Sequence, residues 1–138
     1  MKLTAEMSPK TPEERTAMLQ IPYREAVGSL MYLMIGSRPD IAYSVSLVSR
    51  FMEDPGLSHW KSVKQIFKYI KGTKDLYIEY KYLPTVPNII DVFCDADWGG
   101  DSDTMKSNTG YITLYNEGAI GTRVFNLQLR SPLRKRSI

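Results

Sequence analysis

Three carboxylates stand close together directly after an apolar segment of the chain. The run Val92–Asp101 reads VFCDADWGGD, so that Asp95, Asp97 and Asp101 follow the apolar residues, with two glycines before the last of them. Mg²⁺ prefers carboxylate oxygens and keeps several of its waters, so one carboxylate is never a complete site. Two-metal phosphodiester hydrolysis needs several carboxylates around ions about 4 Å apart. The run predicts the beginning of a phosphoryl-transfer site in which Asp95 binds metal.

A non-catalytic interpretation of the same run stays open. Asp97–Asp103 would then form a solvated, turn-rich loop whose Asp side chains hydrogen-bond to their own backbone. On an extended chain Asp95 and Asp97 point the same way, whereas Asp101 lies beyond a glycine turn. Spacing alone favours this loop over a metal site.

Two other reactive residue types carry weaker predictions. His59 has no Cys, Ser or Asp at a diagnostic spacing, so we expect a partly exposed structural role. Cys94 precedes Asp95 on the apolar segment and is expected to be a small core residue. As the single cysteine it excludes an intramolecular disulfide and fits a reducing compartment, in the cytoplasm or the nucleus.

Nothing in the sequence predicts contact with a membrane. The first residues turn acidic at Glu6 before an apolar signal segment could form. The longest apolar stretch, Ala26–Gly36, is far too short to span a bilayer.

Lysines recur at three- and four-residue spacing near the middle of the sequence. On a helix this spacing makes one basic stripe, consisting of Lys61, Lys64, Lys68 and Lys71 and continued by Lys74. Such a stripe is usually a solvated face, and its alternative is a surface that binds the phosphates of a nucleic acid. From Thr122 to the end the chain is also basic, with five Arg or Lys and no acidic residue. That segment is predicted to be an unstructured tail.

Hydrophobic periodicity predicts three helices between residues 22 and 74. Pro22 opens the first, Gly36–Pro39 separates it from the second, and Ser58 is the predicted N-cap of the third, which ends at Gly72. Residues 1–21, with Pro9 and Pro12, are expected to be a flexible leader.

The period changes from helical to alternating after Gly72. Strands are predicted over residues 76–82, 89–94 and 109–115, with a hairpin turn at Asn116–Gly118 leading into a fourth strand from Ala119. The predicted fold is α+β, in which a three-helix segment is followed by a small antiparallel β-meander. The chain is thus divided into a flexible leader (residues 1–21), a helical segment (22–74), a partial sheet (75–121) and a basic tail (122–138).

Several long motifs in one order resemble the Pol polyproteins of copia-type LTR retrotransposons. The motifs are YREAVGSLMYL (Tyr23–Leu33), SRPDIAYSVSLVSRFM (Ser37–Met52), HWKSVKQIFKYIKGT (His59–Thr73), CDADWGGD (Cys94–Asp101) and KSNTGYI (Lys106–Ile112). The resemblance implies that the helices are the connection after reverse transcriptase. It implies that the strands are the first three of a ribonuclease H-like fold, acting on RNA/DNA hybrids with Mg²⁺.

By this resemblance Asp95 matches the first metal-binding carboxylate of ribonuclease H. The family's later carboxylates have no counterpart, because Ile120 is followed by GTRVFNLQLRSPLRKRSI, and the reverse-transcriptase Tyr-x-Asp-Asp motif is also missing. We therefore expect a truncated fragment that is catalytically inactive as this chain. The alternatives are a non-catalytic, sequence-independent nucleic-acid-binding module and an unselected gene fragment without function.

Overall fold

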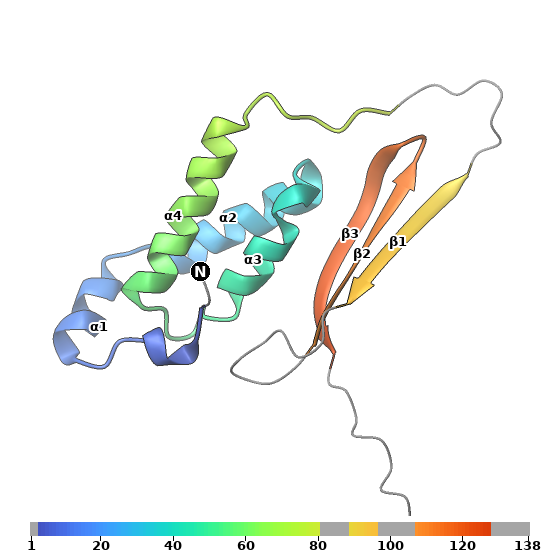
Figure 1. Ribbon diagram of the computed structural model, residues 1–138. Helices are drawn as coiled ribbons and strands as arrows, with labels where there is room; N and C mark the ends of the chain where they lie inside the picture. The colour runs from blue at the N-terminus through green and yellow to red at the C-terminus, as the bar shows by residue number, and fades with distance from the viewer. Residues whose placement is uncertain (1–2, 81–88, 97–106, 128–138) are drawn as a thin grey trace, which may run out of the picture.

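The computed structural model describes residues 3–80, 89–96 and 107–127, in which helices come first and strands second (Figure 1). The α+β prediction is confirmed, with one helix more than expected. The helices are α1 (Pro12–Leu19), α2 (Tyr23–Gly36), α3 (Ala42–Ser49) and α4 (Leu57–Gly72), with 3₁₀ turns η1 (Ala5–Met7) and η2 (Pro39–Ile41). The strands are β1 (Ile90–Ala96), β2 (Ser107–Tyr115) and β3 (Gly118–Leu127). None of the helices in the described part is long and apolar enough to cross a membrane.

The buried core lies between α2, α3 and α4, which together with the preceding residues we call the helical unit (residues 3–72). Each helix contributes apolar side chains at helical spacing, and the fully buried ones include Val27 and Leu30 of α2, Val45 and Val48 of α3 and Val63 of α4. The Tyr23 hydroxyl donates to the Val48 carbonyl oxygen at 2.8 Å and so satisfies a polar group inside this core.

The prediction of a flexible leader is wrong for residues 3–20, which fold onto the three core helices. Leu3 and Met18 are buried, and α1 begins with a complete capping box. The Thr11 hydroxyl accepts from the Glu14 N–H, while the Glu14 carboxylate accepts from the Thr11 N–H. The backbone N–H groups of Lys10 and Thr11 hold the pKa of Glu14 below its usual value. Pro12 lies in the first turn of α1, where proline is tolerated, and not in a loop as the prediction of a leader implies.

The start of α4 also differs from the prediction. Its N-cap is Gly56 rather than Ser58, and the Gly56 N–H donates to Nδ1 of His59 at 2.9 Å. A Cβ at Gly56 would collide with the carbonyl oxygen of Met7, so the close approach of η1 explains the glycine. At the other end, Gly72 is the last residue of α4 and Thr73 is its C-cap.

The three strands form one antiparallel sheet in the order β1-β2-β3, with Asp95 opposite Gly110 and Tyr111 opposite Arg123. The predicted hairpin turn is confirmed. Tyr115 pairs with Gly118, and the two turn residues, Asn116 and Glu117, have φ angles of 48° and 64°. Positive φ at both central positions is the geometry that matches the twist of a two-residue hairpin.

Two expectations about the strands need correction. Residues 76–80 are not a strand; they lie beside the β2–β3 turn, where the Tyr80 hydroxyl donates to the Ala119 carbonyl oxygen at 2.9 Å. The alternating apolar and polar residues at 76–80 therefore belong to an extended segment that pairs with none of the described strands. The tail predicted to be unstructured from Thr122 begins as strand, since β3 continues to Leu127 and each of its residues from Gly121 onward pairs with β2. Residues 81–88 and 128–138 lie outside the described residues.

Candidate functional site

Asp95 lies near the end of β1, as predicted, with an exposed side chain. Alternation along the strand puts Asp95 and Phe93 on the same sheet face. Both line an open cleft of about 290 Å³ between the sheet and the segment that contains Pro39 and Tyr43. Asp97, Asp101 and Asp103 lie outside the described residues. The sheet thus brings Asp95 toward the helical unit.

Whether Mg²⁺ fits at Asp95 depends on the other oxygen ligands nearby. Residues 3–80, 89–96 and 107–127 contain no group of three or more His, Cys, Asp or Glu side chains that could hold a metal. Because Mg²⁺ is held by carboxylates together with other oxygen ligands, the described residues alone do not make its site.

His59 is structural, but it is completely buried instead of partly exposed. Its Nδ1 accepts from the Gly56 N–H, which leaves Nε2 to donate to the Thr4 carbonyl oxygen at 3.1 Å. Its ring stacks on Phe51 with centroids 4.0 Å apart. His59 therefore joins η1, the end of α3 and the start of α4. Cys94, expected in the core, is exposed on β1.

The predicted lysine stripe is present on α4 as one exposed surface, which we call the lysine face (Lys61, Lys64, Lys68 and Lys71). The sequence of α4 contains no Asp or Glu. The salt bridges Arg15–Asp54 and Arg38–Asp40 involve no lysine of this face. Four positive charges are therefore exposed on one side of a sixteen-residue helix.

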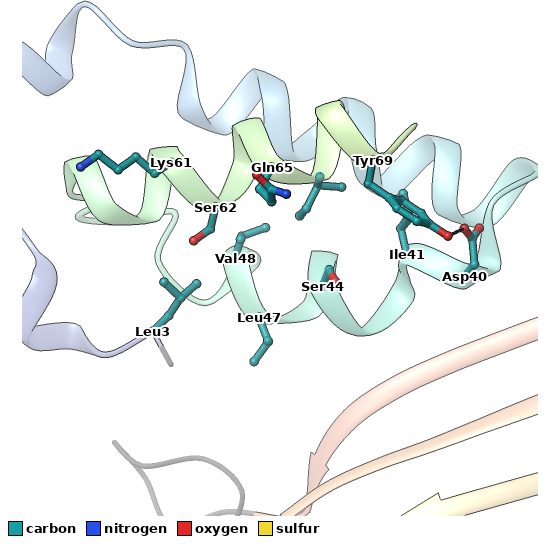
Figure 2. A pocket seen from close by; sticks show the side chains of 11 residues that line it. Leu3, Asp40, Ile41, Ser44, Leu47, Val48, Lys61, Ser62, Gln65 and Tyr69 are labelled. Atoms are coloured by element: carbon teal, nitrogen blue, oxygen red, sulfur yellow. Dashed lines mark hydrogen bonds between the residues drawn. The ribbon is translucent and has the colours of Figure 1, made fainter. Parts of the chain in front are cut away.

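A groove of about 680 Å³ between α3 and α4 borders the lysine face (Figure 2). Lys61 stands at one end of this α3–α4 groove, and Tyr69 and Asp40 stand at the other. Its remaining lining mixes apolar side chains with a few polar ones, including Ser44, Leu47 and Val48 of α3 and Ser62, Gln65 and Ile66 of α4. The groove is not predictable from the sequence, because its two walls come from different helices and the apolar periodicity of each helix marks only its buried side.

A hydrogen-bonded cluster closes the Tyr69 end of the groove. The buried Arg38 guanidinium donates to both carboxylate oxygens of Asp40, at 2.9 and 2.7 Å, and also to the carbonyl and hydroxyl oxygens of Thr73. The Tyr69 hydroxyl donates to Asp40 at 2.9 Å. The Arg38 hydrogen bond lowers the pKa of Asp40 and raises that of Arg38. The cluster ties η2 to the C-terminal end of α4.

Known proteins similar to this chain include the polyproteins of transposons. The chain is 45% identical over 120 residues to the retrovirus-related Pol polyprotein from transposon TNT 1-94 of Nicotiana tabacum, an alignment covering 87% of this chain and 9% of that protein. It is 38% identical over 111 residues to the retrovirus-related Pol polyprotein from transposon RE2 of Arabidopsis thaliana, covering 80% and 7%.

A third relative is much closer to this chain in length. It is the secreted RxLR effector protein 161 of Plasmopara viticola, 36% identical over 106 residues, with 77% of this chain and 73% of that protein covered. No protein-family model and no solved structure matches the chain. The chain spans less than a tenth of the two Pol polyproteins named above. On these similarities, the chain belongs to the retrotransposon Pol polyprotein family, of which it represents one short segment.

Proposed function

We propose that the chain corresponds to the part of a copia-type Pol polyprotein that joins the helical connection after reverse transcriptase to the opening strands of ribonuclease H. By itself, this chain does not cleave nucleic acid. The parent acts on RNA/DNA hybrids with Mg²⁺, in the cytoplasm or the nucleus. The observation that carries the proposal is the position of Asp95, near the end of the first strand of an antiparallel meander that follows the helices.

The inactivity follows from the number of carboxylates. Two-metal hydrolysis needs several of them around two ions, and the chain has no acidic residue after Glu117. The described residues contain no group of three or more His, Cys, Asp or Glu side chains that could hold a metal. Asp95 is therefore a vestigial ligand in this chain.

The test is an assay of the purified full chain with Mg²⁺ and a labelled RNA/DNA hybrid, next to Asp95→Asn. We expect no cleavage above background from either protein. Specific cleavage by the unchanged chain that disappears in Asp95→Asn would overturn the inactivity. Asp91→Asn, an exposed carboxylate on the same strand and sheet face, is the matched control for a general effect of removing a negative charge.

A second candidate function is sequence-independent nucleic-acid binding through the lysine face. Its supporting observation is the set of four exposed lysines on a helix that carries no acidic residue. Such a surface attracts phosphates by releasing their counterions, which makes the affinity fall steeply with salt.

Lys64→Gln tests this candidate against Lys10→Gln, which removes the same charge from an exposed position before α1. We expect Lys64→Gln to weaken binding to a fluorescent oligonucleotide and to reduce the slope of log affinity against log salt by about 0.7 to 0.9. Lys10→Gln should leave both nearly unchanged. Equal effects of the two variants, or no binding by the unchanged chain at low salt, would remove the candidate.

A further inference from the structure

We infer that the α3–α4 groove is a site for unpaired nucleobases of a single-stranded nucleic acid whose phosphates lie on the lysine face. This inference rests on the second candidate function and specifies its ligand. It joins two features of the same helix, a row of positive charges and a concave surface beside it.

The positive charges lie along the rim of the groove. Gln65 lines the groove, and Lys61 and Lys68 stand four residues before it and three residues after it on α4. Side chains at these spacings are neighbours on one side of a helix. With a rise of 1.5 Å per residue, the two ammonium groups belong to positions about 10 Å apart along the axis. A chain of phosphates that follows α4 therefore passes directly beside the groove.

The lining of the groove matches the chemistry of a nucleobase, which has apolar faces and polar edges. Leu47 supplies apolar surface above the buried side chains of Val48 and Ile66. The Gln65 amide and the Ser44 hydroxyl offer hydrogen-bonding groups (Figure 2). The volume of about 680 Å³ lies within the range of small-molecule sites. Aromatic side chains beside basic grooves are the usual platforms on which single-stranded bases stack. The half-exposed ring of Tyr69 lies at one end of the groove, where it could serve as such a platform.

The acidic side chain at the far end of the groove is neutralised by its partners and so does not repel a polyanion. Asp40 is the acidic residue that lines it, and its carboxylate is held by Arg38 at 2.7 Å and by the Tyr69 hydroxyl. A duplex keeps its bases paired and stacked, so its phosphates could reach the lysine face but its bases could not enter the groove. A preference for single strands is therefore the property that separates this inference from phosphate binding alone.

Ser44→Leu is the decisive variant, because it fills the groove from α3 and changes no lysine. Its matched control is Ser29→Leu, the same substitution at an exposed position of α2 outside the groove. The affinities of the full chain for fluorescent oligo-dT and for a DNA hairpin duplex are measured at low salt. We expect Ser44→Leu to weaken oligo-dT binding at least about fivefold, since each stacked base contributes substantially to affinity. Duplex binding should change less than about twofold, as should both affinities of Ser29→Leu.

Lys68→Gln distinguishes phosphate binding on the lysine face from base binding in the α3–α4 groove, because loss of a lysine should weaken binding to both probes. If Lys68→Gln weakens oligo-dT binding and Ser44→Leu does not, the groove takes no base and only the nucleic-acid-binding candidate survives. If the unchanged chain binds neither probe, both fail. Tighter binding to phosphatidylserine-containing vesicles, or full displacement of oligo-dT by polyglutamate, would also overturn the inference. Gln65→Leu, which nearly keeps the volume but loses the amide, supplies a second test should Ser44→Leu fail to fold; unchanged oligo-dT affinity would then count against the site.

Discussion

The helical unit and the sheet bury their apolar side chains to different extents. Leu30, Val45 and Val63 are at most 1% exposed, whereas Ile90, Val92 and Phe93 of β1 are 58–59% exposed. The helices surround a shared core, but the sheet contacts the rest of the described chain mainly where β3 lies against α3 (Figure 1). Because apolar burial is the main favourable contribution to folding, the stability of this chain comes from its helices.

The largest effect that tests this comparison is expected from Leu30→Ala. Removing a fully buried leucine side chain leaves a cavity and should lower the free energy of unfolding by about 3 kcal/mol. Ile90→Ala, on the exposed strand β1, should lower it by less than about 1 kcal/mol. Urea unfolding followed by far-UV circular dichroism measures both. Similar losses for the two variants would mean that the sheet contributes to stability as much as the helices do.

His59→Ala should have the next largest effect, about 2 kcal/mol or more. The substitution removes the acceptor of the Gly56 N–H and the donor to the Thr4 carbonyl oxygen, and it leaves buried polar groups without partners. The segment before α1 should loosen first, so trypsin should cleave after Lys10 faster than in the unchanged chain. Unchanged cleavage together with unchanged urea unfolding would show that these residues are not part of the helical unit's stable structure.

A high-pH measurement tests the buried hydroxyl in the same core. Burial raises the pKa of Tyr23 to about 12, whereas the unfolded chain titrates near the ordinary tyrosine value of about 10. The folded state therefore keeps the proton longer, and its contribution to stability is complete below pH 10 and is lost as the pH rises toward 12. Linkage predicts a loss of about 2 kcal/mol across this window. In Tyr23→Phe, the same titration should show a smaller loss of stability; an equal loss would assign the effect to other groups.

The smallest effect concerns the sheet and is expected to be favourable. Glu117 adopts a φ of 64°, a conformation that side chains other than glycine and asparagine rarely adopt. Glu117→Gly should therefore stabilise the hairpin by about 0.5 to 1 kcal/mol, and Asn-Gly is a preferred pair for this turn. Differential scanning calorimetry would detect a rise in the melting temperature. Glu79→Gly, at an exposed position outside the helices and strands, should not raise it.

The sequence predicted elements well where periodicity and turn chemistry agree. Apolar spacing predicts a helix over Tyr23–Ile35, and α2 covers these residues and Gly36. The turn residues predict the hairpin at Asn116. Predictions failed where a partner distant in the sequence decides the structure. Gly56 is the cap of α4 because Met7 approaches it, and residues 76–80 alternate without a strand to pair with.

The candidate sites also differ in whether a local sequence pattern or only the folded structure reveals them. A local motif was enough to find Asp95 and the lysine face, because their residues lie within one strand or one helix. The α3–α4 groove needed the structure, since Ser44 and Gln65 are apart in the sequence and meet only when the two helices pack. The structural role of Asp40 also needed the structure, because its partner Tyr69 comes from α4, 29 residues further along the chain.

The hydrogen bond between Thr4 and His59 joins residues 55 positions apart, and this separation has a consequence during translation. Leu3 reaches its final environment only after α4, which contains Ile66, has left the ribosome. At about 5 to 20 residues per second, synthesis of the intervening segment takes on the order of 3 to 13 s. During that interval the apolar sides of α2 and α3 have no third helix to cover them. Nascent chains of this segment are therefore expected to be substrates for ribosome-associated chaperones until α4 emerges.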